Sequence, residues 1–160
     1  MNRYIKIYRH PRYIELLQRL EVLEKDRKFC RHNMQHFLDV ARIMLILSFE
    51  QNLSVSKDII YAAALLHDIG RVSQYEQNIP HNKASADIAE TILKDCGYES
   101  RERLEICNAI LNHRNGGDKS CDLLESLLYR ADKLSRLCFS CKANDECYWS
   151  AELKNSDIVI

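Results

Sequence analysis

The sequence is poor in residues that interrupt secondary structure. Its 160 residues include only four glycines and two prolines, and segments in which apolar and polar residues alternate over the length of a strand are nearly absent. Such alternation marks half-buried strands, and glycine and proline mark the turns between them. The scarcity of both argues against a many-stranded sheet and favours an all-α fold.

Net charge and long apolar runs are also missing. Lysine and arginine together number 23, as do aspartate and glutamate, so a basic surface for nucleic acid is not expected and affinity for phosphate would be local. The longest apolar run, residues 59–66, is too short to span a bilayer, and no sustained apolar segment occupies the first twenty residues. We therefore expect a soluble cytoplasmic protein that uses neither nucleic acid nor membrane as a partner.

Seven cysteines, an odd number, are spread along the chain. Because we expect no signal peptide, these cysteines indicate reduced thiols rather than a disulfide framework. Three of them follow the pattern Cys138-x2-Cys141-x5-Cys147, which resembles three ligands of a zinc or iron–sulfur site. A fourth ligand would have to come from Cys121, Cys107 or a partner molecule. Unliganded thiols are the main hypothesis, and a separate cysteine-bound metal is the alternative.

Apolar residues recur with helical period through most of the chain, which predicts one domain, residues 1–160, built as a bundle of about six or seven helices. Ile14, Leu17, Leu20 and Leu23 are predicted to face the core. Residues 71–79 are predicted as a polar loop. The predicted helices cover about residues 11–28, 31–50, 56–70, 80–96, 99–113 and 121–138.

The stretch from Ala63 to Gly70 brings an imidazole and a carboxylate, His67 and Asp68, to the end of an apolar helix. At about 100° per residue, His67 lies on the same inward stripe as Ile60 and Ala63. Gly70 is expected to adopt the left-handed conformation that ends a helix. Two polar groups that enter a core together need a shared partner, and a divalent cation satisfies both.

More histidines and a second aspartate lie on inward stripes of other predicted helices. A lone histidine on an apolar face is usually a satisfied core residue. Four imidazoles and two carboxylates buried without metal would leave many polar atoms unpaired, at about 1–3 kcal/mol each. Nitrogen and oxygen donors favour iron, manganese, cobalt, nickel or zinc over magnesium or calcium. The predicted ligands are His36, His67, Asp68, His81, His113 and Asp132, with His32, one helical turn before His36, as an alternative first ligand.

The order of these residues resembles the HD superfamily of metal-dependent phosphohydrolases, an all-helical family named for its His-Asp doublet. The resemblance covers about residues 28–138 and leaves a cysteine-containing tail, 139–160, outside it. It implies metal-dependent hydrolysis of a nucleotide or a similar small phosphoester or phosphoanhydride. The matching local sequences are His36-x3-Val40-Ala41, Ala64-Leu65-Leu66-His67-Asp68-Ile69-Gly70 and Ala131-Asp132-Lys133.

His81 and His113 resemble the additional histidines of a two-metal branch, in which the counterpart of Asp68 bridges both ions. Within that branch, residues 109–116 and 129–133 are similar to small bacterial enzymes that cleave diadenosine tetraphosphate symmetrically. The resemblance implies a hydroxide held between two cations as the nucleophile. Neighbouring cations would neutralise charge on the phosphoryl oxygens. Arg71 and Lys133 would be catalytic together with Asp68. Substrate binding would involve the same two residues together with Arg114 and Lys83.

Two other functions stay open. Some HD-fold proteins with the same four-histidine, two-aspartate set are di-iron oxygenases that cleave carbon bonds with dioxygen. A non-catalytic helical module could bind a nucleotide and keep its metal for stability. A small phosphorylated molecule is the expected partner in the main hypothesis, and a homodimer is left open.

Overall fold

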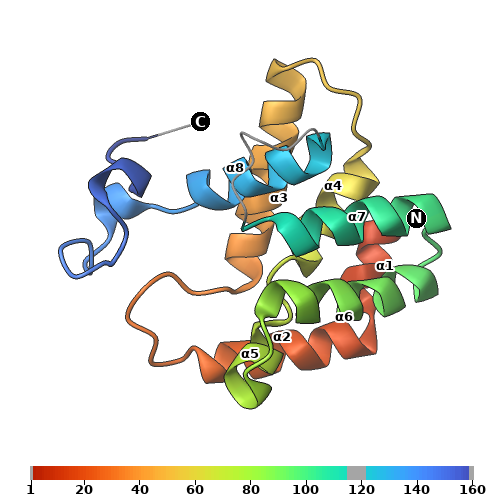
Figure 1. Ribbon diagram of the computed structural model, residues 1–160, viewed down its shortest axis with the longest axis horizontal. Coiled ribbons are helices and arrows are strands. Elements are labelled where there is room, and N and C mark those ends of the chain that lie inside the picture. The colour runs from red at the N-terminus through yellow and green to blue at the C-terminus, as the bar shows by residue number, and fades with distance from the viewer. Residues whose placement is uncertain (1, 115–121, 159–160) are drawn as a thin grey trace.

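The computed structural model describes residues 2–114 and 122–158 (Figure 1). Within these residues it contains eight α-helices, two short 3-10 turns and no strand, which confirms the all-helical fold class. No helix in these ranges is long and apolar enough to cross a membrane. The elements are α1 (Arg3–Arg9), α2 (Pro11–Leu23), α3 (Met34–Glu50), α4 (Lys57–Leu66), α5 (Arg71–Gln77), α6 (His81–Asp95), α7 (Ser100–Asn112), α8 (Leu123–Leu134), η2 (Cys138–Ser140) and η3 (Ala151–Leu153).

Helix α4 lies at the centre of the bundle. It contacts α1, α3, α6, α7 and α8, and Ile60 and residues 62–66 are almost completely buried. Ser56 caps its first turn by accepting a hydrogen bond from the Ile59 backbone nitrogen at 3.3 Å. Because α4 ends at Leu66, the next two residues, His67 and Asp68, leave the helix inside the bundle.

Gly70 follows this turn but not in the predicted conformation. Its φ is −72°, so the expected left-handed conformation is wrong. A Cβ at this position would lie 2.3 Å from the Ser85 backbone nitrogen and 2.6 Å from the His81 carbonyl oxygen. The Ser85 hydroxyl accepts a hydrogen bond from the Gly70 nitrogen at 2.9 Å. Glycine is therefore required because α6 passes directly against the turn that carries the His-Asp doublet.

Helix α2 ends at Leu23, and its inward face differs from the predicted one. Ile14 is 39% exposed, so its assignment to the core is wrong. The buried side chains of α2 are Tyr13, Leu16 and Leu20. A pattern of aliphatic residues alone missed Tyr13, whose fully buried ring takes the inward position beside Ile14.

Residues 24–33 form a loop where the sequence predicted the end of one helix and the start of the next. Glu24 causes the reversal, because its carboxylate accepts the backbone N–H of His32 at 2.6 Å. Asn33 then caps α3 by accepting a hydrogen bond from the His36 nitrogen at 3.0 Å. His32 therefore lies in the loop, and its predicted place on the same helical face as His36 is wrong.

Residues 71–77 form helix α5 rather than the predicted polar loop. Val72 is its buried residue, and Asn78, in the left-handed region at φ 57°, ends it. The segment is otherwise polar because one side packs against α2 and α6 and the rest faces solvent. Helix α1 was also absent from the predicted set.

Helices α7 and α8 are shorter than their predicted ranges. A capping box formed by Glu99 and Glu102 starts α7. Asp122 caps α8 through the backbone nitrogens of Leu124 and Glu125. Cys138 thus lies beyond α8, in η2. Cys121, a candidate fourth cysteine ligand, lies outside the described residues, as do residues 115 and 116 of the segment 109–116.

We predict that Gly70→Ala destabilises the protein by about 3 kcal/mol or more, because the added methyl group overlaps backbone atoms that cannot move independently of α6. Gly97→Ala is the matched control. Gly97 has a φ of +82° but open space around its Cα, so its substitution should cost only about 1–2 kcal/mol of conformational strain. Urea unfolding of metal-stripped protein compares the two, and equal losses would contradict the contact argument.

Candidate metal centre

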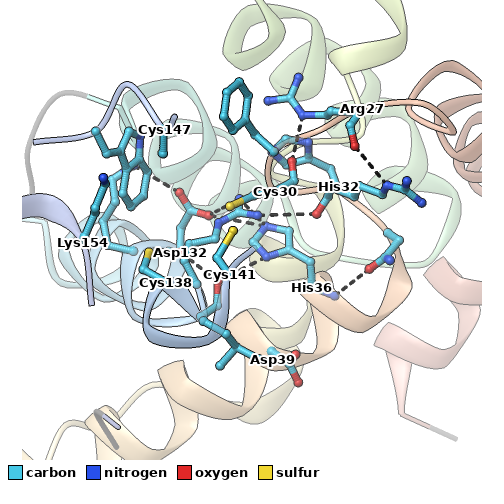
Figure 2. Close-up of a pocket in the computed structure, with 18 of the residues that line it drawn as sticks. Arg27, Cys30, His32, His36, Asp39, Asp132, Cys138, Cys141, Cys147 and Lys154 are labelled. Atoms are coloured by element: carbon cyan, nitrogen blue, oxygen red, sulfur yellow. Dashed lines mark hydrogen bonds and ion pairs between the residues drawn. The ribbon is translucent and has the colours of Figure 1, made fainter. Parts of the chain in front are cut away.

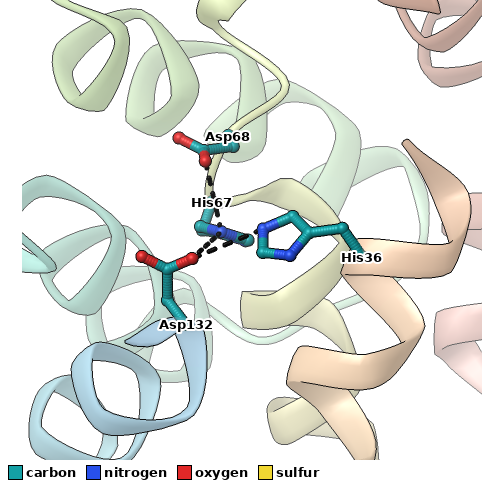
Figure 3. Close-up of side chains that lie close together, drawn as sticks. All are labelled: His36, His67, Asp68 and Asp132. Atoms are coloured by element: carbon teal, nitrogen blue, oxygen red, sulfur yellow. Dashed lines mark ion pairs between the residues drawn. The ribbon is translucent and has the colours of Figure 1, made fainter. Parts of the chain in front are cut away.

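The six predicted ligands meet at the centre of the bundle. They come from α3, the turn after α4, the first residue of α6, the end of α7 and from α8, and each is at most 6% exposed. Within each of two groups, the donor atoms lie within 4.8 Å of one another. The first group, drawn in Figure 3, is His36, His67, Asp68 and Asp132, and the second is Asp68, His81 and His113.

Asp68 belongs to both groups because its two oxygens face in different directions. Oδ2 lies 3.5 Å from His67 Nε2. Oδ1 lies 3.2 Å from His81 Nε2 and 3.7 Å from His113 Nε2. One buried carboxylate therefore connects the two groups.

Asp132 completes the first group from the opposite side. Its Oδ1 lies 3.4 Å from His36 Nε2 and 3.8 Å from His67 Nε2. These spacings are close to the roughly 3 Å that separates neighbouring donors around one transition-metal ion with bonds of about 2.1 Å.

The histidines at the ends of α4 and α7 are oriented in the same way. His67 Nδ1 lies 2.8 Å from the Ala64 carbonyl oxygen, and His113 Nδ1 lies 2.5 Å from the Ile110 carbonyl oxygen, in each case three residues earlier. A proton on Nδ1 that is donated to such a carbonyl leaves Nε2 as the atom that can bind a metal.

Side-chain oxygens orient the other two histidines. His36 Nδ1 lies 3.2 Å from the Ser135 hydroxyl, and His81 Nδ1 lies 3.1 Å from Gln74 Oε1. Gln74 belongs to α5, the helix that the sequence did not predict. All four imidazoles thus turn Nε2 toward the donor groups.

Both carboxylates are held in the ionised form. Burial alone would raise the pKa of Asp68, but the Arg71 guanidinium at 3.1 Å and the neighbouring His67 lower it well below its usual value. Burial is likewise outweighed at Asp132, where the neighbouring His67 and the charge of Arg136 lower the pKa. The ligand carboxylates are therefore negative at neutral pH.

Two of the imidazoles are held neutral. Burial and the nearby Arg136 lower the pKa of His36 well below its usual value, and burial lowers the pKa of His81 to about 3. The Nε2 atoms of His67 and His81 and Oδ1 of Asp68 are buried without a hydrogen-bond partner. Ionised carboxylates and imidazole nitrogens without a hydrogen-bond partner are donors that a divalent cation satisfies. The residues of this centre therefore fit a divalent metal site.

His32 stands outside both donor groups, and the structure places His36 rather than His32 in the first of them. His32 Nε2 lies 3.4 Å from Asp68 Oδ2, and its Nδ1 lies 2.7 Å from Glu24 Oε1. The Tyr75 hydroxyl also donates to Glu24, at 2.8 Å. Burial alone would raise the pKa of Glu24, but the contacts with His32 and Tyr75 outweigh it and lower this pKa to about 2. His32 thus supports Asp68 from the loop.

The predicted cationic residues differ in their distance from the centre. Lys133 Nζ lies 3.4 Å from Asp132 Oδ2, and Arg71 touches Asp68. A cavity lies above the centre, and Arg114 is one of the residues that line it. Lys83 is exposed on α6 and does not line this cavity.

Sequence analysis missed Arg136, which is 7% exposed. Its Nη2 atom lies 3.1 Å from Asp132 Oδ1 and 3.1 Å from His36 Nε2. Arg136 lies four residues, about one helical turn, after the predicted ligand Asp132, and this spacing was the signal that could have identified it. The other missed residue was Glu24, whose contact with His32 depends on a loop.

Comparison with known proteins agrees with this geometry. The HD domain family model matches residues 33–137. The chain belongs to the HD domain family. A crystal structure of a predicted HD superfamily hydrolase from an uncultured Thermotogales bacterium superimposes with a TM-score of 0.63, covering 88% of this chain and 80% of that one. Their identity is 23%, so this similarity supports the HD fold alone.

Two relatives show how far sequence similarity extends. An uncharacterised protein of Clostridium beijerinckii is 48% identical over 158 residues, 99% of both chains. Ribonuclease Y of Acetivibrio thermocellus is 29% identical over 126 residues, which are 79% of this HD domain protein but 21% of the ribonuclease. The chain thus corresponds to about a fifth of that relative.

We predict that metal affinity falls about tenfold per pH unit as the pH drops below the pKa of His67. Burial alone would lower the pKa of His67, but Asp68 and Asp132 raise it above its usual 6.5. Below that raised pKa, His67 binds a proton that an entering cation must displace. Calorimetric titration with Mn²⁺ in buffers of different ionisation enthalpy should show proton release. A pH-independent affinity would contradict this account.

Proposed function

We propose that this HD domain protein is a metal-dependent phosphohydrolase that uses two divalent transition-metal ions, sharing Asp68, to cleave a small phosphoester or phosphoanhydride. The observation that carries the proposal is the division of Asp68 between two donor groups, Oδ2 toward His67 and Oδ1 toward His81 and His113. A paired site of this kind suits in-line displacement at phosphorus, in which attacking and leaving oxygens both need charge stabilisation.

The cavity above the centre supports a phosphorylated substrate. Its volume is about 640 Å³, within the roughly 300–1,000 Å³ typical of small-molecule sites. Among the described residues, the acidic side chains in its lining are Asp39 and Asp132. Basic side chains outnumber them, so the lining attracts anions although the chain has no net charge. These are Arg27, Lys28, Arg31, Arg71, Arg114, Lys133, Arg136 and Lys154.

Bound divalent ions would supply a nucleophile, since coordination lowers the pKa of water from 15.7 to about 7. The protein side chains have separate tasks. Arg71 keeps Asp68 ionised and oriented. Lys133, one third exposed beside Asp132, can reach a phosphoryl oxygen in the cavity and neutralise developing charge there. The buried Arg136 orients Asp132.

A small substrate fits this protein better than a nucleic acid. The name Ribonuclease Y belongs to proteins of which this chain matches about a fifth. Equal numbers of acidic and basic residues provide no broad phosphate-binding surface. Nucleotides, including dinucleoside polyphosphates such as diadenosine tetraphosphate, are the substrate class that we propose.

We predict that the His/Asp centre binds two manganese ions per chain in the wild type, about one in His36→Ala and in His81→Ala, and fewer than one in Asp68→Ala. Each histidine serves one donor group, whereas Asp68 serves both. Elemental analysis after equilibration with Mn²⁺ and gel filtration gives the stoichiometry.

His10→Ala is the matched control, because His10 is the one histidine of the six that lies away from the centre, paired with Asp95 on the surface. It should bind as much metal as the wild type. Retention of both ions in Asp68→Ala would overturn the shared carboxylate.

We also predict phosphate release from a member of a panel of dinucleoside polyphosphates, nucleoside triphosphates and cyclic nucleotides. Lys133→Ala should lower kcat/KM by about 10²-fold with metal content unchanged, because Lys133 is not a ligand. Lys94→Ala, on an exposed position of α6 outside the cavity, should stay within about twofold of the wild type.

The same assays separate the other functions. Cleavage of an oligoribonucleotide but of no small compound would replace the proposed substrate class. Substrate-dependent oxygen uptake without phosphate release would replace hydrolysis by oxygenase chemistry. A metal-loaded protein that binds nucleotides without turnover would make it a binding module.

A further inference from the structure

A cluster of four cysteines lies beside the metal centre and takes no part in it. The tail supplies Cys138, Cys141 and Cys147, and the loop of residues 24–33 supplies Cys30. All four line the same cavity and are labelled in Figure 2. Cys30 is the fourth cysteine that the pattern of the tail lacked, and sequence analysis did not find it because more than 100 residues separate it from the other three.

We propose that Cys30, Cys138, Cys141 and Cys147 form a structural zinc site that fastens the C-terminal tail to the loop of residues 24–33. Structural zinc sites built from four cysteines are tetrahedral, and a C-x2-C pair is their usual building block. Cys138-x2-Cys141 is such a pair, and the other two ligands would come from separate turns.

Contacts on both sides of the cysteines hold the two segments together. The Phe29 ring, next to Cys30, packs edge-on against the Tyr148 ring, next to Cys147, with centroids 5.9 Å apart. Lys28 forms an ion pair with Glu146. The loop and the tail are therefore in register at the residues adjoining Cys30 and Cys147.

Tight turns bring the three tail cysteines to one side of the tail. The Cys141 nitrogen donates to the Cys138 carbonyl at 3.2 Å, and the Cys147 nitrogen donates to the Asn144 carbonyl at 3.2 Å. The Asn144 side chain also donates to the Cys138 carbonyl, at 2.6 Å. These bonds fold residues 138–147 into a compact knuckle without an α-helix or strand.

The thiols are close enough to affect one another. Burial raises the pKa of the Cys30 thiol, and the charges of Cys138, Cys141 and Cys147 raise it further, whereas Arg136 lowers it. Grouped thiolates repel one another unless a cation lies among them. The Arg136 and Lys154 side chains line the same cavity and would offset the double negative charge of a zinc ion bound by four thiolates.

The ion would draw the sulfur atoms closer together. No three of the four satisfy the 4.8 Å mutual separation that the His/Asp donor groups meet, whereas tetrahedral bonds of about 2.3 Å place sulfurs about 3.8 Å apart. Cys30, Cys141 and Cys147 are only partly buried, so side-chain rotation can make much of this adjustment.

The zinc site would stabilise one wall of the cavity. The Trp149 ring, two residues after Cys147, lies 5.0 Å from Lys133 Nζ, and Asn155 donates to the Lys133 carbonyl at 2.9 Å. A tail fixed by zinc would keep Trp149 and Asn155 in contact with Lys133, the residue next to Asp132. This structural role does not depend on the reaction that the centre catalyses.

The test is cobalt substitution of the full-length protein. Thiolate-bound Co²⁺ absorbs in the near ultraviolet through sulfur-to-metal charge transfer, which nitrogen and oxygen ligands do not produce. We expect this absorption to correspond to one thiolate-bound Co²⁺ per chain in the wild type and in Asp68→Ala, which removes the carboxylate that both His/Asp donor groups share. Cys30→Ser and Cys141→Ser should lose it.

The matched controls are Cys96→Ser and Cys107→Ser, since these thiols lie outside the cavity and should leave the absorption unchanged. A second measurement does not require any variant to fold. Titration of the purified wild type with a mercurial reagent should release one zinc ion as about four thiols react.

Three results would overturn the proposal. They are the absence of charge-transfer absorption in the wild type, its persistence in Cys30→Ser, and the visible absorption of an iron–sulfur cluster in protein purified without oxygen. Each leaves the His/Asp centre untouched, so failure here is distinct from failure of the proposed hydrolase activity.

Discussion

The structure depends on keeping the carboxylate of Asp68 ionised while it is 1% exposed. An isolated carboxylate in such a place would take up a proton or disrupt the core. Here the Arg71 guanidinium lies against one oxygen, and imidazoles approach both oxygens. These partners and the residues that orient them come from several helices. The ionised state of Asp68 therefore depends on how the whole bundle is packed. The donor groups around Asp68 fit a divalent metal ion as a further partner.

The sequence predicted those parts of the molecule that follow from local rules. Helical periodicity identified the long helices and placed His67 and His113 on the inward stripes of theirs. Six donors with a defined chain order resembled one family, and the donors converge as that resemblance implied. These features were predictable because each ligand sits on, or at the end of, a helix whose apolar stripe reveals its inward face.

The loops and the short helices were not predictable in this way. The reversal at Glu24 depends on a hydrogen bond to His32 that periodicity cannot reveal, and it changes where His32 lies. Helix α5 contains one buried valine in seven residues, too little for a stripe. The position of Cys30 beside the tail and of Arg136 beside His36 arises from contacts across about 100 residues or more. Side-chain partners at such separation need the folded chain.

The contact between Gly70 and α6 has a consequence for how the spacing of the ligands is maintained. The interval between the His67-Asp68 doublet and His81 is set through space, where the Gly70 nitrogen meets the Ser85 hydroxyl, rather than by the length of the intervening chain. The segment of residues 71–80 could therefore become longer or shorter during evolution or engineering. Other residues would then have to orient His81 and pair with Asp68, as Gln74 and Arg71 do here. The glycine itself could not be exchanged, because a methyl group would push two ligand-bearing segments apart.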